Sequence, residues 1–276
     1  MSLLTSMKWG ALWLTGASLV SHKAPAQLAP AVPRARVYTV QRGDYNVPQV
    51  VLPNTVVARR INQRLARLLV QCEDPDAVDS LATLPRQLQQ AKRASDFDEN
   101  KKPQPISQGF VACSYTVLLN QGGLLSLAYQ CDFRWNQEAS TTGHVTFDLR
   151  TGRPLRLAQL VADSAARLQR RMQAAIDHRL KEHLAEITEE YGDSVTVAYV
   201  ADRYGWDWPT KSVGLNADLS EFALTPKRLL LFYKVDFERI NAPFQMDETY
   251  QFSYSSLQPS PLLKPALARP TIKVSR

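Results

Sequence analysis

Residues 109–161, GFVACSYTVLLNQGGLLSLAYQCDFRWNQEASTTGHVTFDLRTGRPLRLAQLV, decide how this chain folds. Apolar side chains alternate with other residues over 109–119, 124–135 and 143–150, which is typical of β-strands that bury one face. Gly122-Gly123 separates the first two runs and supplies the positive φ values that a tight hairpin turn requires. The stretch therefore predicts an antiparallel sheet, and a long helical pattern follows it.

The predicted hairpin places two cysteines at matching positions. The register that joins the two apolar faces pairs 119 with 125, 117 with 127, 115 with 129 and 113 with 131. It sets Cys113 opposite Cys131, at a Cα separation of about 4.5–5.5 Å that a disulfide bond can span. Cys72, the third cysteine, lies on the apolar face of a predicted helix. Because three thiols do not make a complete set of disulfides, three buried, reduced cysteines fit the sequence equally well.

Residues 1–26 have the pattern of a secretory signal peptide. Lys8 precedes a short apolar stretch, Trp9–Val20, and Ala24-Pro25-Ala26 fits a small-x-small cleavage site. The apolar stretch is shorter than the roughly 20 residues that a membrane-spanning helix needs. We therefore expect a secreted or periplasmic protein with no transmembrane helix in the mature chain. Residues 27–36 are expected to form a flexible lead, and an oxidising compartment would favour the disulfide.

Composition narrows the function classes. The 276 residues are 45% hydrophobic, enough for a substantial core, and carry a formal net charge of +7. The basic side chains are spread along predicted helices, which is typical of solvated helix faces. Because the charge is modest and export is expected, nucleic acid is not an expected partner.

Two helices are read from apolar spacing. Asn54 caps the first, which runs to about Cys72, and a short helix is expected near 77–93. Asp163 or Ser164 caps a much longer helix that ends at Gly192. Its apolar stripe, with every spacing 3 or 4, comprises Val161, Ala165, Leu168, Met172, Ile176, Leu180, Leu184, Ile187 and Tyr191.

The remaining pattern adds strands to the C-terminal half. Alternation predicts a strand at 195–199, a hairpin of 221–224 with 229–237, and a last strand at 250–254. Residues 258–276 are rich in proline and are expected to be a poorly ordered tail. The expected fold class is α/β (α+β): antiparallel sheets, with the long amphipathic helix and a second, shorter helix packed on one face.

With this order of elements, the chain resembles a bacterial envelope domain family of unknown function. The family occurs in the extracytoplasmic part of the lysozyme-sensing anti-sigma-V factor and beside peptidoglycan deacetylase domains. The resemblance spans roughly residues 37–263. The residues that carry it are Gly123-Leu124-Leu125-Ser126-Leu127, Gly143-His144, Phe147-Asp148-Leu149, Thr151-Gly152-Arg153-Pro154-Leu155, Leu224-Thr225-Pro226, Leu229-Leu230-Leu231-Phe232 and Tyr254-Ser255-Ser256-Leu257.

The resemblance implies two interlocked lobes, which would here be 37–135 and 136–258, followed by the proline-rich tail 259–276. The anti-sigma relatives add a cytoplasmic segment and a transmembrane helix, and the deacetylases add a catalytic domain. This sequence shows neither, so lysozyme sensing and deacetylation do not carry over from the resemblance. What it implies is a module that binds an envelope protein or a cell-wall glycan.

Two features are candidates for a ligand site. His144 follows a glycine just before a strand, where it either contacts a ligand or bonds a backbone carbonyl in a turn. Tyr204, Trp206 and Trp208 lie on a loop with Gly205. Aromatic faces on such a loop either stack on a sugar or a partner, or cover the edge of the core.

No recognised catalytic, metal or cofactor motif is present. Asp96-Phe97-Asp98 begins like a calcium loop, but the later ligand positions do not fit. His178 and His183 are five residues apart, a spacing that does not suit chelation on a helix. We therefore expect a non-enzymatic binding or sensing module without cofactor or metal. An accessory structural envelope protein and an envelope hydrolase of unrecognised type remain open.

Overall fold

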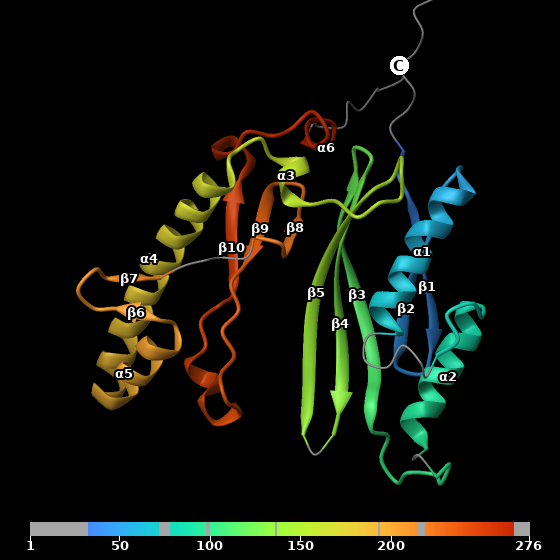
Figure 1. Cartoon of the computed structure of the whole chain (residues 1–276), viewed down its shortest axis with the longest axis horizontal. Helices are drawn as coiled ribbons and strands as arrows, with labels where there is room; N and C mark the ends of the chain where they lie inside the picture. The colour runs from blue at the N-terminus through green and yellow to red at the C-terminus, as the bar shows by residue number, and fades with distance from the viewer. Residues whose placement is uncertain are drawn as a thin grey trace, which may run out of the picture. The chain divides into compact units, whose positions relative to one another are not determined.

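The computed structural model describes residues 33–71, 78–97, 100–135, 137–192, 194–214 and 219–267, all within one compact unit, Val32–Arg276. These residues form a five-stranded, a three-stranded and a two-stranded sheet together with helices (Figure 1). The strand pairs of the described residues are antiparallel, except that β2 runs parallel to β3. The predicted α+β class is confirmed.

The five-stranded sheet has the strand order β1-β2-β3-β4-β5. Its strands are β1 (Arg36–Arg42), β2 (Tyr45–Val51), β3 (Gly109–Gln121), β4 (Leu124–Arg134) and β5 (Glu138–Asp148). The sheet thus contains the three strands predicted from residues 109–161, and β1 and β2 extend it beside β3.

The β3–β4 register follows the prediction over most of its length. Cys113 faces Cys131, and the pairs 115/129 and 117/127 form as expected, but Leu119 faces Ser126 instead of Leu125. A register shift between Val117 and Leu119 causes the difference. The irregularity turns Leu119 to the other side of the sheet, where it joins the core beneath the long helix.

Two helices cover one face of this sheet (Figure 1). They are α1 (Thr55–Leu69) and α2 (Leu84–Asp96), and the Asn54 side chain caps α1 by accepting from two backbone N–H groups, as predicted. α1 packs its apolar face, including Ile61 and Leu65, against Leu127 and Phe147 of the sheet. The sheet face turned towards α1 and α2 therefore carries odd-numbered residues of β4 and β5.

The C-terminal half is built on a three-stranded sheet and a long helix. The sheet has the order β10-β9-β8, from β8 (Phe222–Leu224), β9 (Arg228–Phe232) and β10 (Thr249–Ser253). The smaller elements are α3 (Leu157–Leu160), α5 (Ser194–Arg203), β6 (Trp206–Asp207), β7 (Ser212–Val213), η1 (Arg239–Phe244), η2 (Tyr254–Ser256) and α6 (Lys264–Leu267).

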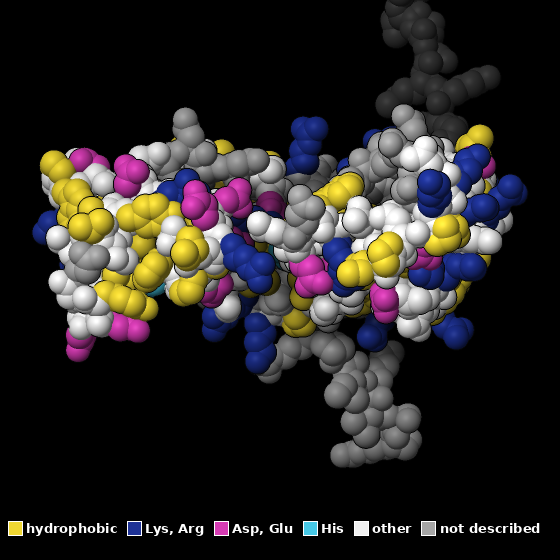
Figure 2. Space-filling model, turned by 90° about the horizontal axis from the view of Figure 1, so that it is seen from below, with side chains coloured by type: hydrophobic (Ala, Val, Ile, Leu, Met, Phe, Trp, Pro, Cys, Tyr) yellow, Lys and Arg dark blue, Asp and Glu magenta, His cyan; other side chains and the backbone are white. Residues whose placement is uncertain are grey.

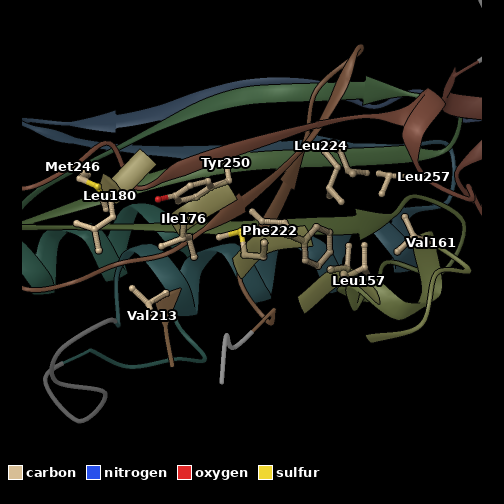
Figure 3. Close-up of a cluster of buried hydrophobic side chains, with 14 of the residues drawn as sticks. Leu157, Val161, Ile176, Leu180, Val213, Phe222, Leu224, Met246, Tyr250 and Leu257 are labelled. Carbon is tan, nitrogen blue, oxygen red and sulfur yellow. The ribbon is translucent and has the colours of Figure 1, made fainter. Parts of the chain in front are cut away.

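The long helix, α4 (Ala165–Tyr191), matches its prediction closely. The Ser164 side chain caps its start, and Gly192 ends it in the left-handed conformation at φ +60°. The predicted stripe is buried from Leu168 to Ile187, whereas Ala165 and Tyr191, its members in the first and last turns of α4, are exposed. Val161, its first member, is buried but lies before α4. Figure 3 shows the resulting core, in which Ile176 and Leu180 of α4 lie in one cluster with side chains of α3 and of the three-stranded sheet.

The strand predicted at 195–199 is wrong, because these residues form helix α5. The alternation of apolar residues coexists there with a helical spacing, in which Val197, Val200, Ala201 and Tyr204 recur at intervals of three and four. Val200 and Ala201 are buried against α4, while Val195 is exposed. The sequence fits both a strand period and a helical period, and packing against α4 selects the helix.

The tail predicted from residue 258 is also wrong as far as residue 267. Pro259 forms a bridge with Val161, and Leu263 and Ala266 are buried. The Gln121 side chain donates to the carbonyl of Ala266 at 2.6 Å. Prolines disfavour regular structure, but they do not prevent a segment from packing as irregular chain.

A buried polar contact joins the two larger sheets. The Ser126 hydroxyl of β4 accepts from the Leu224 N–H of β8 at 3.0 Å and from the Thr146 hydroxyl of β5 at 2.9 Å. Ser126 has no exposed surface. β8 therefore lies against the sheet face opposite α1 and α2, which brings the C-terminal strands to His144.

None of the helices in the described ranges has both the length and the apolar composition of a membrane span. The predicted signal peptide, residues 1–26, lies outside the described residues.

Candidate functional site

His144 lies in β5, on the sheet face turned away from α1 and α2, because its neighbour Val145 belongs to the core under α1. Its imidazole stacks on the Phe232 ring of β9, with ring centroids 3.8 Å apart and planes 13° from parallel. Nδ1 lies 2.8 Å from Oε1 of Glu221, and the His144 side chain is only 7% exposed. The histidine is thus held between the two larger sheets.

Lys234 completes a cluster of three charged or titratable groups. Its Nζ lies 3.0 Å from Oε2 of Glu221 and donates to the Thr142 carbonyl at 2.7 Å. We call His144, Glu221 and Lys234 the His144 cluster. Glu221 stands at its centre and joins β5 to the segment that follows β9.

Lys234 lowers the pKa of two nearby carboxylates, Glu221 and Glu248, but the net shifts of the two have opposite directions. Burial alone raises the pKa of Glu221, but hydrogen bonds from His144 and Lys234 outweigh it and hold the pKa below its ordinary value. Burial also raises the pKa of Glu248, and the attraction of Lys234 offsets this only in part. Glu221 is therefore the stable anion of the site, and Glu248 is the carboxyl that holds its proton more tightly.

The His144 cluster has one feature of a catalytic dyad. A carboxylate that holds Nδ1 fixes the imidazole so that Nε2 can act as a base or an acid. Nε2 of His144 makes no hydrogen bond to any residue of the described ranges. The sequence left open a hydrogen bond between His144 and a backbone carbonyl. In the structure the carboxylate of Glu221 takes that place. Within the described part of the chain, no group of three or more His, Cys, Asp or Glu side chains is placed to hold a metal ion.

The aromatic loop is mostly part of the core. Tyr204 is buried, its hydroxyl accepts from the Met246 N–H at 2.8 Å, and burial raises its pKa. Trp206 is also buried and meets the Trp208 ring edge-on, with centroids 6.5 Å apart. Trp208 alone projects outward, with 54% of its surface exposed. Of the three aromatic candidates, Trp208 is the one whose ring is available to a ligand.

The structure does not bring His144 and the aromatic loop together. His144 stacks on Phe232, whereas Tyr204 packs near the next residue, Tyr233, with centroids 6.4 Å apart. Side chains of consecutive extended residues point to opposite sides. His144 therefore lies on the side of the first sheet, and Tyr204 lies on the side of α4.

The two cysteines face each other in the buried core beside α2, but no disulfide joins them in the described structure. The Cys113 thiol instead donates to the Asn46 carbonyl at 3.8 Å, and the Cys131 thiol donates to the Leu68 carbonyl at 3.7 Å. The expected bond is thus replaced by contacts of the two sulfur atoms with different elements, β2 and α1. Cys72 lies outside the described residues.

An exposed apolar surface lies where α4 ends and α5 and η1 begin. Its members are Tyr191, Val195 and Ile240, which are 49%, 73% and 81% exposed, and Phe244, whose ring meets that of Tyr191 at 5.4 Å. Figure 2, seen from below the view of Figure 1, shows hydrophobic side chains gathered on the left, over this part of the molecule. We call these four residues the end surface.

Sequence reasoning missed Glu221, Lys234 and the end surface. Glu221 lies 77 residues from His144, and no spacing signals such a contact. Tyr191 was assigned to the buried stripe because it continues the helical period. Gly192 indicates that Tyr191 is exposed, because a helix that ends at Gly192 leaves its last turn at the edge of the core.

Comparison with known proteins finds distant structural neighbours. No protein-family model and no curated protein matches the chain. Two similar solved structures are a DUF3298 family protein from Pseudomonas aeruginosa PAO1 and a DUF3298 family member from Bacteroides fragilis. The first has 15% identity and a TM-score of 0.46, covering 84% of this chain and 94% of its own. The second has 13% identity and a TM-score of 0.43, covering 84% and 96%. Neither neighbour bears on the resemblance to the anti-sigma-V factor, which stays a prediction.

Proposed function

We propose that this chain is a secreted or periplasmic, non-enzymatic binding and sensing module of the bacterial cell envelope. Its end surface contacts a basic partner protein, and a muralytic enzyme fits that description. The observation that supports this most directly is the exposure of Tyr191, Val195 and Ile240, on segments that the contact between the Tyr191 and Phe244 rings brings together. Grouped apolar side chains on a protein surface are typical of an interaction site.

Charge around the end surface supports a basic partner. The segments 186–191 and 236–244 carry Glu186, Glu189, Glu190, Asp236 and Glu238 against the single arginine Arg239. This local excess of carboxylates contrasts with the formal net charge of +7 for the whole chain. An apolar centre with an acidic rim attracts a basic protein and buries its apolar contacts, and such attraction weakens as salt is added.

Binding to lysozyme, as a basic muralytic probe, tests the proposal. Titration calorimetry with the full chain should detect a complex whose dissociation constant rises with ionic strength. Ile240→Ser and Val195→Ser should each weaken it about tenfold, because exposed apolar anchors carry much of such binding energy. Leu81→Ser is the matched control, since Leu81 is 93% exposed but lies before α2. Equal affinity for Ile240→Ser and Leu81→Ser would remove the end surface from the proposal.

A cell-wall glycan is the alternative ligand, and exposed Trp208 favours it. An aromatic ring with an open face can stack on a sugar. Titration with purified muropeptides should then show binding that Trp208→Ala abolishes and Ile240→Ser leaves unchanged. Loss of binding in Trp208→Ala thus indicates a glycan ligand, whereas loss of binding in Ile240→Ser indicates a protein partner.

A hydrolase is the second candidate function, and one observation favours it: the 2.8 Å contact between His144 and Glu221. It predicts that the purified protein releases soluble fragments from peptidoglycan. Substituting His144→Gln would then abolish release while leaving the fold intact, since glutamine can still bond Glu221. Absence of release by the unmodified protein would rule this candidate out for that substrate.

A further inference from the structure

The outer face of α1 carries arginines and no carboxylate. α1 buries Ile61 and Leu65 on the five-stranded sheet, which leaves its opposite face to solvent. Arg59, Arg60 and Arg64 are exposed on that face, and none of them forms an ion pair with a residue of the described ranges. α4, by contrast, intersperses acidic and basic side chains, as a solvated helix face ordinarily does. The charge on α1 is therefore of one sign.

A second segment adds to this charge. The loop after β5 reaches the first turns of α1, because the Arg60 guanidinium donates to the Thr151 carbonyl. A Cβ built on Gly152 would lie 3.4 Å from Cβ of Arg60, which shows how closely the loop packs there. Arg153, the next residue of the loop, is exposed and has no ion pair within the described part of the chain. We call Arg59, Arg60, Arg64 and Arg153 the arginine surface.

Exposed apolar side chains stand at the edge of the arginine surface. Val56, one helical turn before Arg59, is 62% exposed. Val51 and Leu81 are 47% and 93% exposed, and they line an open hollow of about 500 Å³ beside α1 together with Arg59. Asp79, the acidic residue nearest to Leu81 in the sequence, already accepts from the Leu81 N–H at 2.9 Å. The surface thus has a basic centre and an apolar edge.

This arrangement restricts the partner. In a protein–protein interface the apolar residues form the centre and the polar residues form the rim, which is the reverse of the order found here. A soluble polyanion would pair with the arginines but leave the apolar side chains in water. The surface of an anionic bilayer suits both groups, because its phosphates accept from guanidinium groups and its acyl boundary accepts apolar side chains.

From these observations we propose that the arginine surface docks the protein on an anionic phospholipid bilayer, with Val56 as an apolar anchor. Each arginine near an anionic leaflet strengthens binding about fivefold, so the four together predict half-binding near about 1 mM lipid. The apolar anchors lower that concentration. The arginine surface shares no residue with the end surface, and the docking does not depend on the proposed function.

Cosedimentation of the full chain with vesicles measures the docking. Vesicles of equal parts phosphatidylglycerol and phosphatidylcholine should bind half of the protein below about 1 mM lipid, and vesicles of phosphatidylcholine alone should not. High salt should release the protein, because it screens exposed charges. Equal binding to both kinds of vesicle, or no binding to the anionic vesicles at low salt, would overturn the proposal.

A triple variant, Arg59→Gln with Arg64→Gln and Arg153→Gln, removes charge from the arginine surface. It should bind the anionic vesicles about a hundredfold more weakly. Arg60 is kept, because its bond to Thr151 holds the loop. A melting temperature within the range of surface substitutions shows that the variant is folded.

The matched control removes the same charge from other elements. It combines Arg170→Gln and Lys181→Gln on α4 with Lys227→Gln in the turn between β8 and β9, and all three side chains are exposed. Its affinity should stay within about twofold, since distant exposed charges are screened. Equal weakening of the two triple variants would assign the attraction to net charge and refute the role of the arginine surface.

Two valines test the apolar anchor. Val56 and Val195 are each the second residue of a helix, and they are 62% and 73% exposed. Val56→Ser should weaken vesicle binding about fivefold, while Val195→Ser, on the end surface, should leave it unchanged. If Val56→Ser has no effect and soluble polyglutamate binds the arginine surface as tightly as the vesicles do, its partner is an acidic polypeptide and the membrane proposal is refuted.

Discussion

The turn between β3 and β4 provides the sharpest test of how the C-terminal segment is held. Gly122 has φ +60°, and a Cβ built on it would lie 2.2 Å from the backbone N and Cα of Ala266. Gly122→Ala therefore adds two costs: the strain of an alanine in left-handed conformation and the displacement of the segment that carries Ala266. Gly192 has the same φ, +60°, but nothing lies within 4 Å of its added Cβ. Gly192→Ala is the control that isolates the strain.

The expected magnitudes differ by a measurable amount. The left-handed conformation costs an alanine about 1–2 kcal/mol, which is the whole expected effect at Gly192. At Gly122 the segment must also lift, and exposing buried Leu263 alone costs about 1.5–3 kcal/mol. Gly122→Ala should therefore lower the free energy of unfolding by about 2.5–5 kcal/mol in all. In a chain of this size the excess over Gly192→Ala, about 1.5–3 kcal/mol, corresponds to a melting temperature lower by roughly 3–12 °C.

Chemical denaturation of five chains measures these terms. Three are full-length: the unmodified protein, Gly122→Ala and Gly192→Ala. The fourth is Gly122→Ala in a chain ending at Leu257, and the fifth, the truncated parent, is its reference. Without the segment, Gly122→Ala should cost only the strain of about 1–2 kcal/mol. Equal losses for Gly122→Ala and Gly192→Ala in the full chain would show that residues 258–267 do not press on the turn, and would refute the reasoning.

Three further predictions concern the polar groups between the sheets. Ser126→Ala leaves two buried donors without an acceptor and should lower the free energy of unfolding by about 1–3 kcal/mol, whereas Ser114→Ala on the exposed part of β3 should change it by less than about 0.5 kcal/mol in denaturant titrations. The lowered pKa of Glu221 means that its contribution to stability is complete above the ordinary glutamate value of 4.5 and is lost as pH falls through the lower folded value. Melting temperatures of the unmodified protein and Glu221→Gln should thus differ most at neutral pH and converge in acid; a constant gap would contradict the linkage. Glu248 has a raised pKa, so its ionisation opposes folding as pH rises through the folded value, and Glu248→Gln should melt above the unmodified protein at pH 7 but not below pH 4.5.

Local pattern predicted the elements whose period is unambiguous. The stripe from Ala165 to Tyr191 has eight positions in α4, long enough that only a helix fits it, and the cap at Ser164 and the end at Gly192 follow from the same pattern. The opposition of Cys113 and Cys131 followed from matching two apolar faces, because a slip of one residue would expose an entire set. At 195–199 the run is too short to distinguish the two periods, and contact with α4 selects the helix.

The candidate site depended on contacts that sequence does not encode locally. His144 was singled out, but its partner Glu221 is 77 residues away and reaches it only because β8 docks on the first sheet. Trp206 and Trp208 are two residues apart, a spacing that would place both on one face of a strand, yet Trp206 is buried and Trp208 is exposed because β6 ends at Asp207 and Trp208 lies in the turn.

The contact between Gln121 and Ala266 joins two residues that are synthesised at different times. Gln121, at the β3–β4 turn, is synthesised 145 residues before Ala266, whose carbonyl accepts its hydrogen bond. During that interval the growing polypeptide has the hairpin but not its cover, and an unoccupied apolar seam of this kind is a natural target for a chaperone. Closure of the fold thus awaits synthesis of residues 258–267, and a product that stops before them would have the described strands but an unfinished core.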